Sequence, residues 1–100
     1  MKIKWNKVAI KQLMDAMAYL EENKLSVYGK KIEKQIFSKI TSISSGEQVA
    51  EPDPLKIDND GSFFILVVDR YRIAYRKTAK GLRILRISVI QDSPDIKTVK

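Results

Sequence analysis

Two arginines, Arg72 and Arg76, stand four residues apart in the run Tyr71-Arg72-Ile73-Ala74-Tyr75-Arg76. Alternation with a period of two is typical of a half-buried strand, so Arg72, Ala74 and Arg76 are expected on one face. Guanidinium groups stay charged at any physiological pH and offer fork-shaped sets of donors. On a stiff strand they form a pre-set contact for a phosphate or a carboxylate. The run therefore indicates a binding function more directly than a catalytic one.

The next apolar segment adds Arg83 and Arg86. They are three positions apart, so a regular strand places them on opposite faces and at most one of them beside Arg72. We take Arg72, Arg76 and Arg86 as candidate binding residues and assign no catalytic residue. The alternative explanation is a solvated strand face whose charges serve only solubility.

The charge of the chain favours an acidic partner. Lys and Arg number 19 against 12 Asp and Glu, a net charge of +7, and there is no His. Nucleic acid, a ribosome, a membrane surface or an acidic protein all suit such a field. The charge is uneven: residues 1–45 carry nine lysines against four acids, residues 46–62 one lysine against five acids, and residues 63–100 nine basic residues against three acids. Two basic ends therefore flank an acidic middle.

Several classes of site and location are not expected. Without Cys or His, the chain has no disulfide, no thiolate nucleophile and no usual metal site, and no cofactor is implied. No apolar run approaches the length of a membrane span, and the N-terminus lacks the pattern of a signal peptide. We therefore expect a soluble, unprocessed cytoplasmic protein that does not bind a membrane, with residues 1–100 as a single domain.

The elements that must position the arginines begin with two helices. Residues 2–5 alternate as a first strand, and Asn6 is a plausible N-cap. A helix is expected from Lys7 to about Glu22, ending at Asn23-Lys24, where Asn tolerates the left-handed conformation. Its stripe consists of Ala9, Leu13, Ala16, Met17 and Leu20.

A second helix is expected from about Val27 to Ser44, with Ser26 as its cap. Four isoleucines recur along it at spacings of four, four and three: Ile32, Ile36, Ile40 and Ile43. Because few residues separate the two helices, they should form an antiparallel hairpin whose stripes face one sheet.

The second half of the chain is predicted to form a sheet. Residues 45–62, rich in Ser, Gly, Pro and acids, read as a connector. Phe63 to Val68, Tyr71 to Lys77 and Leu82 to Ile90 read as three antiparallel strands, with Phe63, Phe64, Tyr71 and Tyr75 in the core. The polar tail from Gln91 is expected to be loosely held. The fold class is α+β in the order β-α-α-β-β-β, the hairpin packing on one face of an antiparallel sheet.

This order of elements resembles the RelE/ParE superfamily of toxins from bacterial type II toxin–antitoxin systems, of the plasmid stabilisation type. The resemblance covers nearly the whole chain. Its matching points are Trp5, Ala9, Leu13, the isoleucine stripe, Pro54-Leu55, Tyr71-Arg72-Ile73-Ala74-Tyr75 and Ile84-Leu85-Arg86-Ile87.

The resemblance implies a cognate antitoxin and one of two targets. RelE-like members cut mRNA on the ribosome, whereas ParE-like members inhibit DNA gyrase. The strand arginine of RelE-like enzymes falls on Arg72, but their two strand lysines fall near Phe63 and Ile65, and their later basic residue near Asp92. This interpretation of the resemblance therefore favours a ParE-like inhibitor of gyrase, with Arg72, Arg76 and Arg86 as target- or RNA-binding residues.

Two alternatives stay open, an mRNA endonuclease of RelE type and a basic nucleic-acid-binding module. For the antitoxin we expect a segment that folds on binding and lays apolar and acidic residues across the sheet or the helical hairpin. The resemblance also leaves room for a homo-oligomer.

Overall fold

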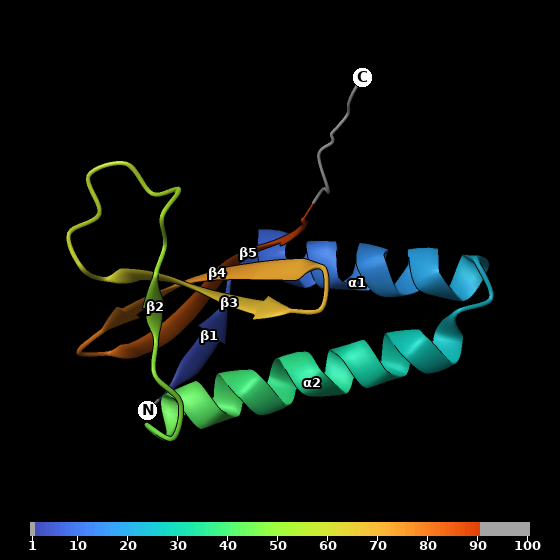
Figure 1. Cartoon of the computed structure of the whole chain (residues 1–100), viewed down its shortest axis with the longest axis horizontal. Helices are drawn as coiled ribbons and strands as arrows, with labels where there is room; N and C mark the ends of the chain where they lie inside the picture. Colours follow the sequence, from blue (N-terminus) through green and yellow to red (C-terminus); the bar gives the residue numbers. More distant parts are fainter. Residues whose placement is uncertain (1, 91–100) are drawn as a thin grey trace.

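One short strand and two helices precede four further strands in the computed structural model, which describes residues 2–90 (Figure 1). The elements are β1 (Ile3–Trp5), α1 (Lys7–Glu22), α2 (Ser26–Ser44), β2 (Glu51–Pro52), β3 (Phe63–Val68), β4 (Tyr71–Thr78) and β5 (Gly81–Val89). The predicted α+β class, the helical hairpin and the C-terminal meander are confirmed. The expected loose tail from Gln91 lies outside the described residues.

The five strands form one sheet in the order β1-β5-β4-β3-β2. The strands from β5 to β2 pair antiparallel, but β1 pairs parallel with β5, with Ile3 opposite Leu82 and Trp5 opposite Ile84. The sheet is therefore mixed: its C-terminal meander is antiparallel as predicted, whereas the parallel pairing of β1 was not foreseen. Alternation within a strand says which face a side chain takes, but it carries no information on the direction of the neighbouring strand.

Strand β2 lies inside the segment predicted as a connector. Glu51 pairs with Ile65 and Pro52 with Phe64 at the edge of the sheet. Two residues are too few to show a period, and Pro is tolerated in a strand only where its missing N–H faces away from the ladder. The sequence therefore gave no local signal for β2.

The hairpin of α1 and α2, which run side by side in Figure 1, covers one side of the sheet. All four isoleucines of the α2 stripe are buried, as are Ala9, Leu13 and Leu20 of α1, while Ala16 and Met17 are partly buried. The strands meet them with a set of buried side chains: Leu66, Val68, Tyr71, Ile73, Tyr75, Leu82, Ile84 and Ile87. The stripes predicted for both helices are confirmed.

The ends of the helices differ from the prediction in their side-chain contacts. Asn6 is the N-cap residue of α1 but makes no side-chain cap, because its Oδ1 accepts a hydrogen bond from Nη1 of Arg83 at 2.9 Å. At the other end Lys24, not Asn23, adopts the left-handed conformation, with φ of 61°. Leu25 is the N-cap residue of α2, so the predicted cap at Ser26 was wrong.

Candidate functional site

The side of the sheet turned away from the helices, here called the outer face, holds the predicted arginines. Directly paired residues of neighbouring strands point to the same face. Arg72 pairs with Val67 and Ser88, Ala74 with Ile65 and Arg86, and Arg76 with Phe63 and Arg83. Lys4 of β1 extends the last row, because it pairs with Arg83. The outer face therefore combines five cations with an apolar column along β3.

Arg83 and Arg86 share this face because the pairing of β4 with β5 is irregular. Tyr75 pairs with Ile84 but its neighbour Ala74 pairs with Arg86, so Leu85 is an extra residue in β5. A bulge of this kind shifts the alternation of the bulged strand by one residue. The prediction that at most one of the two arginines lies beside Arg72 was therefore wrong.

Arg72 lies half-buried on the outer face, between Val67 of β3 and Ser88 of β5. Its Nε is buried and has no hydrogen-bond partner in the part of the chain that the structure describes. A buried donor on a charged group is costly to leave unpaired. Because this atom is closed off from the surface, an acceptor on another molecule could meet only the remaining N–H groups of the half-buried guanidinium.

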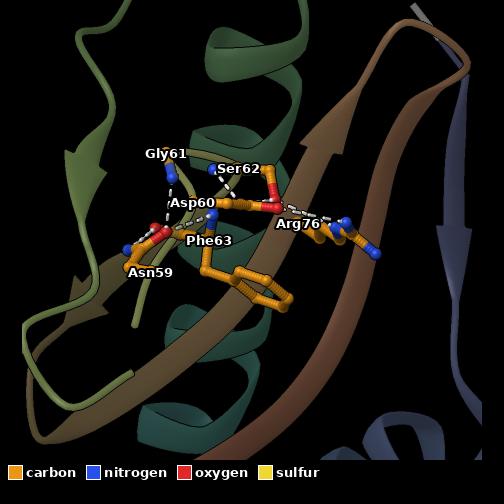
Figure 2. Close-up of polar contacts among 6 residues, drawn as sticks. All are labelled: Asn59, Asp60, Gly61, Ser62, Phe63 and Arg76. Carbon is orange, nitrogen blue, oxygen red and sulfur yellow. Dashed lines mark hydrogen bonds and ion pairs between the residues drawn. The ribbon is translucent and has the colours of Figure 1, made fainter. Parts of the chain in front are cut away.

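Arg76 already has an anionic partner inside the chain, as Figure 2 shows. Its Nε donates to Oγ of Ser62 at 3.0 Å, and its Nη2 lies 3.6 Å from a carboxylate oxygen of Asp60. The guanidinium carbon also lies 4.8 Å from the centre of the Phe63 ring, a cation–π contact. A partner that engages Arg76 must therefore compete with Asp60.

The loop that supplies Asp60 is folded by its own side chains. Oδ1 of Asn59 accepts hydrogen bonds from the backbone N–H groups of Gly61 at 2.9 Å and Phe63 at 3.3 Å, and Nδ2 of Asn59 donates to the carbonyl of Phe63 at 2.8 Å (Figure 2). Hydrogen bonds from the hydroxyl and the backbone N–H of Ser62 lower the pKa of Asp60, with a smaller contribution from the charge of Arg76. Asp60 is therefore held as a carboxylate beside Arg76.

Arg86 is exposed and makes no hydrogen bond or ion pair within residues 2–90. Its partner in the ladder is Ala74, so it lies one row from Arg72 on the adjacent strand. Of the three predicted binding residues, Arg72 and Arg86 thus lie next to each other. Within residues 2–90, neither Nε of Arg72 nor the side chain of Arg86 has a partner. Arg76 stands apart with Asp60.

The comparisons with known proteins show the fold. No family model matches the sequence, and no curated protein matches it. Among solved structures, the chain is similar to a chain of the chromosomal ParDE TA (toxin–antitoxin) system from P. aeruginosa. The TM-score is 0.70 at 16% sequence identity, and the match covers 91% of this chain and 97% of that chain. The two chains therefore share a fold over nearly their whole lengths.

A hollow lies on the helix side of the sheet, where the tip of the helical hairpin approaches the turn between β3 and β4. It has a volume of about 1040 Å³. The hydroxyl of Tyr28 donates to the Asp69 carboxylate at 2.6 Å at its wall, and this hydrogen bond raises the pKa of Tyr28 to about 12. Oε1 of Gln12 accepts from the N–H of Ile87 at 2.7 Å, which ties α1 to β5. These contacts fasten the hairpin to the sheet.

Other kinds of site leave no trace in residues 2–90. There, no three side chains of His, Cys, Asp or Glu come together as a metal-binding group. No helix of the same range is both long and apolar enough to cross a membrane.

Sequence reasoning missed four residues that shape the outer face: Lys4, Asp60, Ser62 and Arg83. The acidic run before β3 was visible in the sequence, but its contact with Arg76 depends on the fold. The placement of Phe63 in the core was wrong, since it lies half-buried on the outer face while Phe64 packs against the core. Adjacent residues of a strand point to opposite faces, so the pair Phe63-Phe64 could have revealed this.

Proposed function

We propose that this chain, acting as one domain, is the toxin of a bacterial type II toxin–antitoxin system of the plasmid stabilisation type. In this proposal the cytoplasmic toxin inhibits DNA gyrase and is neutralised by a cognate antitoxin. The observation that carries the proposal is the fold shared with a chain of the ParDE system over nearly the full length of both chains. A fold alone does not fix an activity, so the outer face supplies the rest of the support.

The side chains of the outer face favour binding over RNA cleavage. Cleavage through the ribose 2′-OH needs groups that move protons in the transition state. The arginines stay protonated, and two positions that could carry other groups hold Phe63 and Ile65. Tyr71 and Tyr75 are buried on the helix side of the sheet. The described part of the face therefore offers anion contacts and an apolar surface, which suit a protein target.

The same face suits the antitoxin. Arg72 and Arg86 lie next to an apolar column formed by Phe63, Ile65 and Val67 along β3. An acidic, amphipathic segment that folds on binding would place carboxylates on the arginines and apolar side chains on the column. Neutralisation would then follow from occupation of the surface that the target needs.

One observation favours the second candidate, an mRNA endonuclease of RelE type. Arg72 lies half-buried on the outer face, at the position onto which the resemblance carries the strand arginine of those enzymes. The accessible part of its guanidinium suits a phosphate in a transition state as well as a carboxylate. Primer extension on ribosome-bound mRNA separates the candidates, because only the endonuclease produces cuts.

Inducible expression in a bacterium tests the proposal. We expect growth arrest, relief of the arrest by co-expression of the product of the neighbouring gene, and inhibition of gyrase supercoiling by the purified chain. No arrest, together with no binding to that product, would refute the toxin assignment.

The paired variant Arg72→Ala/Arg86→Ala should weaken target binding by about tenfold or more, as expected for arginines central to an interface. Lys30→Ala/Lys34→Ala is the matched control, since it removes the same charge from exposed positions of α2. Equal toxicity of the two variants would remove the outer face from the mechanism.

A further inference from the structure

A small basic cleft lies where the turn between β4 and β5 meets β1, about 410 Å³ in volume. Lys2, Lys4, Thr78, Lys80, Gly81, Leu82 and Arg83 line it. Four of these seven residues are cationic and none is acidic. The cleft does not include Arg72, Arg76 or Arg86.

The backbone builds the cleft through a close contact at Gly81. The N–H of Leu82 donates to the carbonyl of Lys2 at 2.7 Å, which draws the start of β5 against β1. Gly81 has φ of 135°, and a Cβ placed on it would lie 2.3 Å from the carbonyl oxygen of Lys2. Only glycine fits this approach. Because Gly81 has no side chain, the backbone of Lys2 can approach the start of β5 this closely.

Two cations of the cleft, Lys4 and Arg83, lie in one row of the sheet with Arg76. Lys4, Arg83 and Arg76 pair across three adjacent strands, so like charges face each other directly. Such pairs are unfavourable in a sheet unless a counter-charge lies between them. Asp60 supplies one for Arg76, but no ion pair to Lys4 or Arg83 is found in residues 2–90. The arrangement is incomplete without an external anion.

The guanidinium of Arg83 is held in one orientation, in which it can bind such an anion. Its Nη1 donates to Oδ1 of Asn6 at 2.9 Å, which fixes the orientation of the guanidinium. The other donors of the guanidinium are left for a ligand. The same contact explains why Asn6 does not cap α1.

We propose that this cleft binds the phosphodiester backbone of a nucleic acid. An acidic protein segment would need apolar contacts as well as charge pairs. The cleft presents no exposed large apolar side chain, since the one large apolar residue in its lining, Leu82, is only 3% exposed. A sugar–phosphate backbone needs only cations and hydrogen-bond donors, which is what the lining provides. The inference does not rest on the toxin assignment, because it concerns residues outside the proposed target contact.

Fluorescence anisotropy with the full chain tests the proposal. The probes are a labelled DNA duplex and a labelled single-stranded RNA of about 20 nucleotides per strand, titrated from about 50 to 200 mM salt. The cleft variant Lys4→Gln/Lys80→Gln should reduce the slope of log affinity against log salt by about 1.8 on duplex DNA, or about 1.4 on the single strand. Each lost duplex contact corresponds to about eightfold between 0.1 and 1 M salt, so affinity at 0.1 M should fall about 60-fold.

The control Lys30→Gln/Lys34→Gln carries the same change in net charge on exposed positions of α2. It should bind as the unchanged chain does. Equal slopes for the cleft variant and the control would overturn the proposal, as would binding of polyglutamate at the cleft with no binding of nucleic acid. A preference for duplex or single strand would identify the source of the backbone, and either outcome, or equal binding, supports the shared chemistry.

Circular dichroism must show that both variants melt like the unchanged chain. If the double variant loses structure, the single change Lys2→Gln serves in its place, with an expected slope change of about 0.9 on the duplex. A chain that binds nucleic acid through this cleft, but neither arrests growth nor binds the product of the neighbouring gene, would refute the toxin assignment and leave the present inference intact.

Discussion

Replacement of Gly81 by alanine should detach β1 from the sheet. Two effects add at this position. The φ of 135° is a conformation that L-residues rarely adopt, which costs about 1–3 kcal/mol. The new methyl carbon would also lie 2.3 Å from the carbonyl oxygen of Lys2, a backbone atom that can move only if β1 moves. The hydrogen bond from Leu82 to that carbonyl is then lost, at about 0.5–1.5 kcal/mol.

The total of about 1.5–4.5 kcal/mol is a large part of the free energy of unfolding of a domain of this size, about 5–15 kcal/mol. At about 4–8 °C per kcal/mol, the melting temperature should fall by at least about 6 °C. Urea unfolding gives the free energy of unfolding. The fluorescence of Trp5 reports on β1, because Trp5 is the only tryptophan and its ring centre lies 5.5 Å from that of Phe37.

Gly46 provides the control. It also has a positive φ, 82°, but a Cβ on it would meet nothing within 4 Å. Gly46→Ala therefore measures backbone strain without a collision, about 1–2 kcal/mol. If Gly81→Ala destabilises no more than Gly46→Ala, or if the emission of Trp5 is unchanged in the native state, then the contact with Lys2 does not hold β1 in place.

Two further predictions concern stability. The hydrogen bond to Asp69 raises the pKa of Tyr28 to about 12, and burial raises that of Tyr75 to about 12, so both phenols ionise more readily in the unfolded chain. Stability should hold below about pH 10 and fall as the pH rises towards 12, and Tyr28→Phe should weaken this fall in urea midpoints measured across that range; an unchanged fall would contradict the role of Tyr28. Ile36→Ala, at a fully buried position of α2, should cost about 2–5 kcal/mol in urea unfolding, against less than about 0.5 kcal/mol for Val27→Ala at an exposed one; similar costs would contradict the core assignment.

The helices could be predicted closely because their signal is local. Helical spacing of apolar residues is visible within about 18 residues, and the bounds expected for α1 and α2 differ from those observed by no more than one residue at either end. The side-chain caps could not be predicted, because the side chain of Asn6 accepts a hydrogen bond from Arg83 and does not cap its own helix. That contact joins residues 77 positions apart, and no local pattern records it.

The outer face was predicted less completely because its composition depends on pairing between strands. The alternation in β4 placed Arg72 and Arg76 correctly on one face. In β5 the extra residue Leu85 reverses the alternation, so a strict period of two assigns Arg83 to the wrong side. The signal of a bulge lies in the register with the neighbouring strand, which a single sequence does not contain.

The bulge at Leu85 also explains how one small face could serve two partners. It brings Arg83 and Arg86 to the same side of the sheet. Arg83 pairs with Arg76 and lies next to β1, whereas Arg86 pairs with Ala74 and lies near the apolar column. The cations of the outer face are thereby divided between a cleft that presents no exposed large apolar side chain and a patch that lies beside the apolar column. Asp60 neutralises Arg76 at the boundary between them. Because a nucleic acid needs charge alone and a protein segment needs apolar contact as well, this division would let each partner select its own half of the face.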